Sequence, residues 1–137
     1  MRILLDTNVV VSALLFGGAP RALLRSLCLP TFEIWTSRAL LRELSATLNY
    51  AKLRNALEQT GFDVRALIQA YASQCFVVPE SSLAVVIFDP DPRDAAVLAA
   101  AQGAKAGWLV TGDRHLLEMA DPPCEIITIA QALRRVG

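Results

Sequence analysis

Two aspartates each follow a short apolar segment that is typical of a β-strand, and they are the first residues with a chemical interpretation. Asp6 comes directly after residues 3–5, and Asp113 closely follows residues 108–111. The carboxyl ends of parallel strands share one sheet edge, which is where ligands bind in such sheets. Both carboxylates are therefore expected to face one crevice. The alternative is that each caps the helix after it, because aspartate accepts hydrogen bonds from first-turn amides.

A further acidic pair opens an alanine-rich segment in the sequence Asp91-Pro92-Arg93-Asp94. Asp91 suits the N-cap position and Pro92 the first helical position, which explains both residues structurally. Asp94 falls at the third position, where a carboxylate also suits the helix dipole. The segment is so apolar that one side of its helix must be buried. An inward-facing Asp94 would then need a partner.

Glu43 lies within a predicted helix at residues 37–48, beside Leu44. Taken alone, it is explained by exposure to solvent or by pairing with Arg42 or Arg38. It gains chemical meaning only if it joins the three aspartates. Carboxylates gathered at one edge repel one another and do not stay ionised in a dry cleft without cations.

Oxygen ligands of this kind select Mg²⁺ or Mn²⁺. The sequence offers no set of histidine or cysteine ligands for zinc. Its one histidine, His115, is predicted to be a partly exposed residue of a short helix after Asp113. A magnesium or manganese carboxylate site indicates phosphoryl chemistry, in which the metal activates water and neutralises charge on the phosphate.

The elements that must position these residues alternate along the chain. Strands are predicted at residues 3–5, 33–35, 75–78, 84–88, 108–111 and 125–127, with helices in the intervals and a final helix at residues 129–136. This alternation favours an α/β sandwich with a mostly parallel sheet, since parallel neighbours need crossover connections of such length. Helices at residues 52–57 and 63–73, separated by Gly61, are expected to pack as a helical hairpin.

Composition sets the remaining limits. The chain has 137 residues, 54% of them hydrophobic, which predicts one domain over residues 1–137 with a substantial core. Thirteen basic residues balance thirteen acidic ones, so nucleic-acid binding must depend on local patches. Three cysteines without a C-x-x-C pair fit a reducing compartment. No export signal or spanning segment is evident, and a soluble, cytoplasmic protein is expected.

Four short motifs in this order resemble the PIN-domain family, and more narrowly its bacterial VapC-type toxin ribonucleases. They are Leu4-Leu5-Asp6-Thr7-Asn8, Arg42-Glu43-Leu44, Asp91-Pro92-Arg93-Asp94-Ala95 and Leu109-Val110-Thr111-Gly112-Asp113. Each is weak alone, whereas the four together, with the expected elements between them, are specific. The resemblance implies a Rossmann-like three-layer α/β/α sandwich, a Mg²⁺ or Mn²⁺ cofactor and hydrolysis of RNA.

The resemblance also assigns roles by position. It implies that Asp6, Glu43, Asp94 and Asp113 are the catalytic, metal-binding residues and that Asn8 and Thr111 hydrogen-bond ligands or water. Asp91 matches a less uniform acidic position. Ala95 departs from the pattern, because many relatives have Asn or Asp there. The substrate-binding residues stay unknown, since ordinary surface charge explains most of the basic side chains.

Two functional classes stay open. The first is an active endoribonuclease, the toxin of a bacterial toxin-antitoxin system, with RNA as substrate and a cognate antitoxin as partner. The second is a PIN-fold binding or scaffold module that cleaves little. The intact acidic quartet favours the enzyme, because a module relieved of catalysis has no need of mutually repelling carboxylates. A homodimer is also expected, since PIN relatives commonly dimerise, and residues 52–73 are expected to form part of a partner surface.

Overall fold

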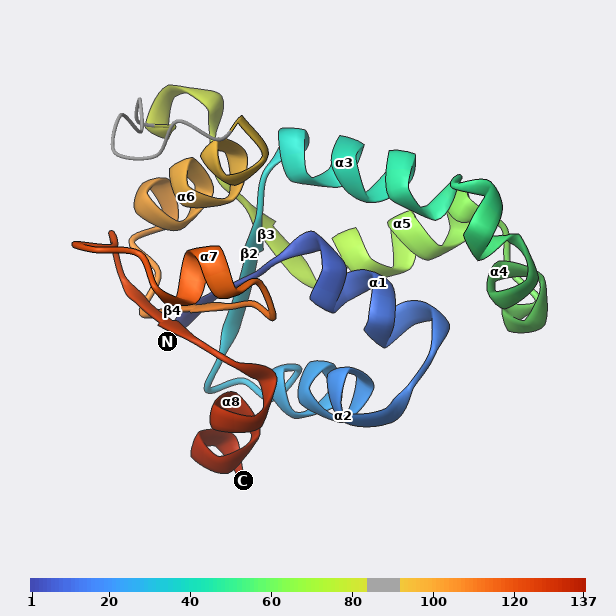
Figure 1. Cartoon of the computed structure of the whole chain (residues 1–137), viewed down its shortest axis with the longest axis horizontal. Coiled ribbons are helices and arrows are strands. Elements are labelled where there is room, and N and C mark those ends of the chain that lie inside the picture. The colour runs from blue at the N-terminus through green and yellow to red at the C-terminus, as the bar shows by residue number, and fades with distance from the viewer. Residues whose placement is uncertain (84–91) are drawn as a thin grey trace.

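A five-stranded parallel sheet forms the centre of the computed structural model, which describes residues 1–83 and 92–137 (Figure 1). The strand order is β3-β2-β1-β4-β5, and every neighbouring pair is parallel. The predicted α/β class and parallel sheet are thus confirmed. The strand predicted at residues 84–88 lies outside the described residues. The strands are β1 (Arg2–Leu5), β2 (Glu33–Thr36), β3 (Cys75–Val77), β4 (Trp108–Val110) and β5 (Glu125–Ile127).

Strands β1 and β4 are buried on both faces, which explains why residues 3–5 and 108–110 are continuously apolar. Successive side chains of a strand point to opposite faces. Ile3 and Leu5 of β1 accordingly belong to one core cluster, while Leu4 belongs to another. Leu4 lies in register with Trp35 of β2 and Leu109 of β4, so the second cluster continues across the sheet.

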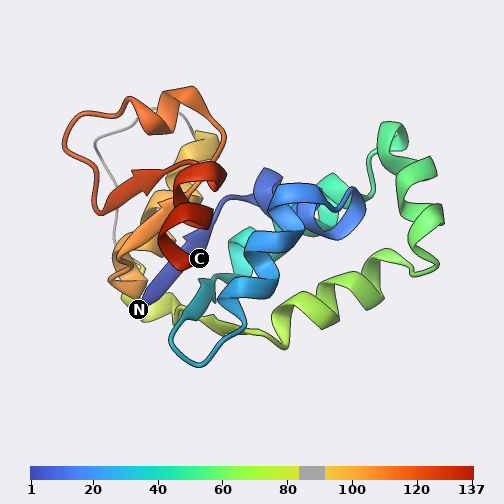
Figure 2. The ribbon, with the colours of Figure 1, turned by 90° about the horizontal axis from the view of Figure 1, so that it is seen from below.

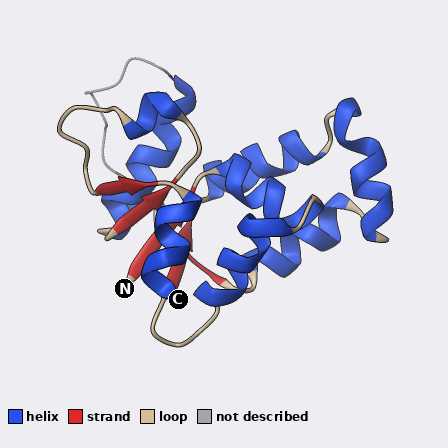
Figure 3. Ribbon diagram, turned by 60° about the horizontal axis from the view of Figure 1, so that its bottom comes forward, coloured by secondary structure: helices blue, strands red, loops and turns tan. Residues whose placement is uncertain are grey.

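Helices cover both faces of the sheet (Figure 3). The cluster around Ile3 and Leu5 is completed mainly by α1 (Thr7–Leu15), α2 (Gly18–Leu27), α3 (Arg38–Leu48) and α5 (Val64–Ala72), with a smaller contribution from α8 (Ile129–Val136). The cluster around Leu4 is completed mainly by α6 (Pro92–Ala104) and α7 (Arg114–Leu117). The result is the predicted three-layer sandwich. The remaining helical elements are η1 (Ala51–Leu53), α4 (Arg54–Thr60) and η2 (Glu80–Ser82).

Local capping explains where several of these helices begin. The Ser37 hydroxyl accepts the Leu40 amide hydrogen at 3.2 Å, and the Asp63 carboxylate accepts that of Ala66 at 2.8 Å. Thr128 and Gln131 form a reciprocal capping box at the start of α8. These bonds satisfy amides that have no partner within the helix. They place the helix starts close to where the sequence predicted them.

The segment between residues 51 and 72 differs from the expected hairpin. It begins as the 3₁₀ turn η1, and α4 continues to Thr60, before Gly61 ends it in the left-handed region at a φ of 75°. The two helices do not pack mainly on each other, and Figure 2 shows them running at a steep angle to one another. Instead, α5 packs on α3, while α4 contacts α1. The reason is that α5 buries Leu67 and Tyr71, whereas α4 buries no residue.

Among the described residues, no single helix is long and apolar enough to cross a membrane. Helices α1 and α2 would have the length and apolar composition of a membrane span only if they were taken together, and they are bent by 103° relative to each other.

Candidate acidic site at the carboxyl edge of the sheet

Asp6 lies where β1 ends and α1 begins, and hydrogen bonds hold both of its carboxylate oxygens. Its Oδ1 accepts the Thr7 amide hydrogen at 2.8 Å, and its Oδ2 accepts the Thr111 hydroxyl hydrogen at 2.7 Å. The Asp6 amide donates to the Val110 carbonyl at 3.0 Å, which continues the pairing of β1 with β4. Asp6 therefore does cap α1, and in addition it is tied to the neighbouring strand.

Thr111 links the two aspartates at this edge. Its side chain is fully buried, and its hydroxyl accepts the Asp113 amide hydrogen at 3.0 Å while donating to Asp6. Asp113 caps α7, because its Oδ1 accepts the His115 amide hydrogen at 2.9 Å. The expectation that Asp6 and Asp113 share one edge of a parallel sheet is met. The buried Thr111 hydroxyl contacts both of these residues, the Asp6 carboxylate and the Asp113 amide.

Glu43 reaches the same edge from α3, which packs on α1. Its side chain is half-buried, and no ion pair joins it to Arg38 or Arg42 among the described residues. Burial raises the pKa of Glu43, and the nearby carboxylates of Asp6 and Asp94 raise it further, while a hydrogen bond with the Thr7 side chain lowers it. Glu43 is thus only partly exposed to solvent and is not paired with either arginine, and its nearest charges are the carboxylates of the acidic group.

Asp94 occupies the first turn of α6 and is only 5% exposed. Its Oδ2 lies 2.7 Å from Nδ1 of His115. The sequence predicted that an inward-facing carboxylate here would need a partner, and His115 supplies one. His115 is partly exposed as predicted, but its contact with Asp94 was not foreseen.

The four carboxylates influence one another electrostatically. Burial raises the pKa of Asp6, and Asp113 adds to the rise, while the hydrogen bonds from Thr111 and Thr7 oppose it. The charges are contributed by the β1–α1 junction, α3, α6 and the start of α7, so no single element creates the repulsion. Across residues 1–83 and 92–137, no three His, Cys, Asp or Glu side chains are spaced closely enough to hold one metal ion between them.

The other residues that the sequence analysis named lie in different surroundings. Asn8 is exposed on the first turn of α1, Ala95 is half-buried in α6, and Asp91 lies outside the described residues. Two residues of this region were missed: buried Thr7, which contacts Glu43, and His115. Their only sequence signal is their position, since Thr7 directly follows Asp6 and His115 lies two residues after Asp113.

Parallel α/β folds with carboxylates gathered beyond the strand ends form a class that binds ligands at that edge. Residues 2–115 match the family described as the PIN domain. The chain therefore belongs to the PIN-domain family, whose members are generally nucleases.

Solved structures share the fold. One chain in the crystal structure of VapBC2 from Rickettsia felis, bound to a DNA fragment from their promoter, aligns with a TM-score of 0.64. The alignment covers 93% of the present chain and 98% of that chain, at 18% sequence identity. A comparison with curated proteins finds no match. The likeness to VapBC2 establishes the three-layer fold over nearly the whole chain.

Proposed function

We propose that this PIN-domain protein is a metal-dependent endoribonuclease that hydrolyses RNA phosphodiester bonds, with Asp6, Glu43, Asp94 and Asp113 as its catalytic, metal-binding residues. The observation that carries the proposal is that four elements bring these carboxylates to one sheet edge, where Asp6 and Glu43 have raised pKa values partly because of the others. Such repulsion is unfavourable in an isolated protein, and a bound cation relieves it.

The donor set fits a hard divalent cation. All four side chains offer carboxylate oxygens, which suit Mg²⁺ and Mn²⁺. Mg²⁺ keeps several of its waters and takes one or two carboxylates directly, so it does not require three side chains at ligand spacing. A bound ion would activate water and neutralise charge on the phosphate.

The chain's own residues prepare this site. Thr111 holds the Asp6 carboxylate through its hydroxyl, and the His115 amide holds Asp113. Both contacts orient carboxylates before a ligand arrives, which reduces the reorganisation needed on binding. Asn8, exposed two residues after Asp6, is proposed to hydrogen-bond the substrate or its water. Asp91 is proposed as an auxiliary acidic residue on the strength of the motif alone.

RNA cleavage in Mg²⁺ or Mn²⁺ tests the proposal. Asp6→Asn and Asp94→Asn are expected to lose most of the activity, because each removes one negative oxygen donor. Asp63→Asn is the matched control, since Asp63 caps α5 and Asn is nearly as good an N-cap. Full activity in both site variants would overturn the nuclease assignment. Metal binding without cleavage by the wild type would instead favour the scaffold alternative.

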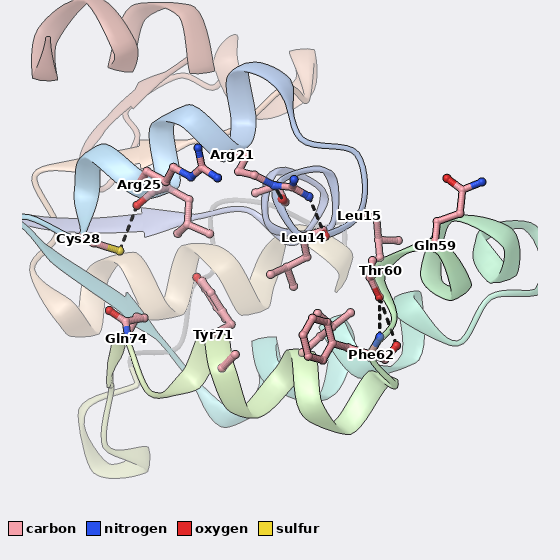
Figure 4. A pocket seen from close by; sticks show the side chains of 14 residues that line it. Leu14, Leu15, Arg21, Arg25, Cys28, Gln59, Thr60, Phe62, Tyr71 and Gln74 are labelled. Atoms are coloured by element: carbon pink, nitrogen blue, oxygen red, sulfur yellow. Dashed lines mark hydrogen bonds between the residues drawn. The ribbon is translucent and has the colours of Figure 1, made fainter.

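We further propose that the protein is the toxin of a bacterial toxin-antitoxin system and that its antitoxin binds a groove beside α5. The groove has a volume of about 670 Å³ and lies between α1 and α2 on one side and the α4–α5 segment on the other (Figure 4). Leu14, Leu24 and Phe62 contribute apolar surface to it, and Arg21 and Arg25 contribute positive charge.

This lining fits an amphipathic antitoxin helix that carries acidic residues beside its apolar face. Arg21 is already anchored, because its guanidinium donates to the carbonyls of Ala13 and Leu14 at 2.9 and 3.2 Å. An anchored arginine loses little side-chain freedom when it meets a carboxylate. Hydrogen exchange with a cognate antitoxin should show protection of α5 and of the end of α4. Protection confined to α6 and α7 would refute this assignment.

A further inference from the structure

His115 contacts two of the four carboxylates at once, although they belong to different elements. Its ring Nδ1 lies 2.7 Å from Asp94 Oδ2, and its backbone amide donates to Asp113 Oδ1 at 2.9 Å. The first contact crosses from α7 to α6, which lie beside each other (Figure 1). The second is local to the start of α7. His115 thus connects the start of α7 to the start of α6.

The Asp94–His115 pair is asymmetric in its exposure. The Asp94 side chain is 7% exposed, whereas that of His115 is 59% exposed. A buried carboxylate depends on hydrogen-bond donors from the protein, because water reaches it poorly. When Asp94 is ionised, its carboxylate can only accept, and the hydrogen of this bond is then carried by Nδ1 of His115. The ring therefore stabilises Asp94 from the solvent side.

This contact constrains the orientation of the Asp94 carboxylate. Rotation about its terminal torsion would carry Oδ2 away from Nδ1 and break the short hydrogen bond. Hydrogen bonds to ligating groups fix their orientation, and loss of such a partner commonly lowers metal affinity by about 10- to 100-fold. Thr111 makes the corresponding contact to Asp6. His115 therefore does for Asp94 what Thr111 does for Asp6.

We propose that His115 is a positioning residue of the acidic site: by holding Oδ2 of Asp94 through Nδ1, it sets how tightly the site binds a divalent cation. This inference rests on the proposed function, because it takes Asp94 to be a metal-binding residue. The histidine acts on the cation through Asp94 and does not itself contact it.

Mn²⁺ binding to the RNA-free protein, measured by calorimetry or by paramagnetic resonance, tests this role without any activity measurement. His115→Ala is expected to weaken Mn²⁺ binding by about 10- to 100-fold. His115→Asn should restore most of the affinity, because its side-chain amide lies near the position of Nδ1 and can donate to Asp94. His115→Gln, whose amide lies nearer the position of Nε2, should not. Glu118→Gln, an exposed change next to α7, should bind as the wild type does.

Thermal melts of each variant without metal test whether the fold is intact. Asp6→Asn serves as the reference for a damaged metal site. If Asp6→Asn loses Mn²⁺ while His115→Ala keeps full affinity, the positioning role is overturned and the proposed metal site stands. If His115→Gln recovers binding and His115→Asn does not, the ring acts through Nε2, and the role through Asp94 is again overturned. If the wild type binds no Mn²⁺, the proposed function and this inference fail together.

Discussion

Asp6 has two hydrogen bonds to its carboxylate, yet its pKa lies above its usual value of 3.8 because burial and Asp113 outweigh them. The pKa of Glu43 is likewise raised from 4.5. A carboxyl group whose pKa is higher in the folded state favours folding most at acid pH, below its unfolded pKa. That contribution is lost as the pH rises through the folded pKa. The metal-free protein should therefore lose this stability as the pH rises from acid values through the folded-state pKa values of Asp6 and Glu43.

Asp6→Asn should make the metal-free protein at least as stable as the wild type at neutral pH and should flatten its pH dependence. Asn cannot ionise, and it remains a good N-cap. Urea unfolding in EDTA over a series of pH values measures both effects, and Mg²⁺ should stabilise the wild type more than the variant. If the variant unfolded more readily at neutral pH and kept the wild-type pH slope, repulsion at Asp6 would be ruled out.

Thr111→Val should destabilise the protein and weaken the site. The change keeps the shape of the side chain but removes the hydroxyl that donates to Asp6 and accepts from Asp113. Loss of hydrogen bonds at a buried position costs about 1–3 kcal/mol for each group left unsatisfied. Chemical unfolding should show this loss, and Mn²⁺ titration should show lower affinity. Thr111→Ser keeps the hydroxyl and is the control. Equal behaviour of the Val and Ser variants would contradict the role assigned to Thr111.

At the scale of elements, the position of α6 determines where Asp94 lies. Gly103, near the end of α6, faces the chain at η2 so closely that a Cβ would lie 2.7 Å from the Ser82 carbonyl oxygen and 2.8 Å from Val78 Cγ1. The absence of a side chain at residue 103 is therefore what allows α6 to pack this close to the end of β3 and η2.

Gly103→Ala is accordingly expected to destabilise the protein by about 1–3 kcal/mol, as overpacking does. An alanine in an unobstructed helix would instead stabilise it by roughly 0.5–1 kcal/mol. Thermal or urea unfolding distinguishes the two signs. Gln102→Ala, an exposed change in the same helix, is the control and should have little effect. A more stable Gly103→Ala protein would show that α6 can move without cost.

The α4–α5 segment presents Phe62, which is 61% exposed and lines the groove. Phe62→Ser should weaken antitoxin binding at least 10-fold, because exposed aromatic side chains are frequent anchors of interfaces. RNA cleavage without antitoxin should not change. Tyr50→Ser is the matched control, since Tyr50 is 51% exposed and does not line the groove. Binding assays that show equal affinity for both variants would place the antitoxin elsewhere.

At the scale of the whole molecule, the chain exposes more large apolar side chains than its groove accounts for. Phe76 and Val77 are both exposed on the edge strand β3, and Phe16 is exposed at the end of α1. Exposed apolar surface of this kind is typical of protein interfaces. Sedimentation at micromolar concentrations is therefore expected to show a homodimer. A monomer under these conditions would refute the expectation.

Several features of this protein could be predicted from sequence because local physics decides them. Caps such as Ser37 and Asp63 mark helix starts through bonds within four residues. The continuously apolar strands indicate a parallel sheet, which brings strand-end residues such as Asp6 and Asp113 to one edge. The motif pattern identified the family. The four acidic site residues were predicted from these motifs together with the resemblance to that family.

Tertiary structure alone decided which side chains meet across elements. Glu43 joins the site because α3 packs on α1 beside Thr7, and His115 meets Asp94 across 21 residues of sequence. Tertiary structure also decided that α4 packs on α1 and α5 on α3, where the sequence predicted a hairpin of the two helices. Periodicity determines which face of a helix is apolar, but not which neighbour buries it. That choice depends on how all the apolar faces can be covered together at close-packed density.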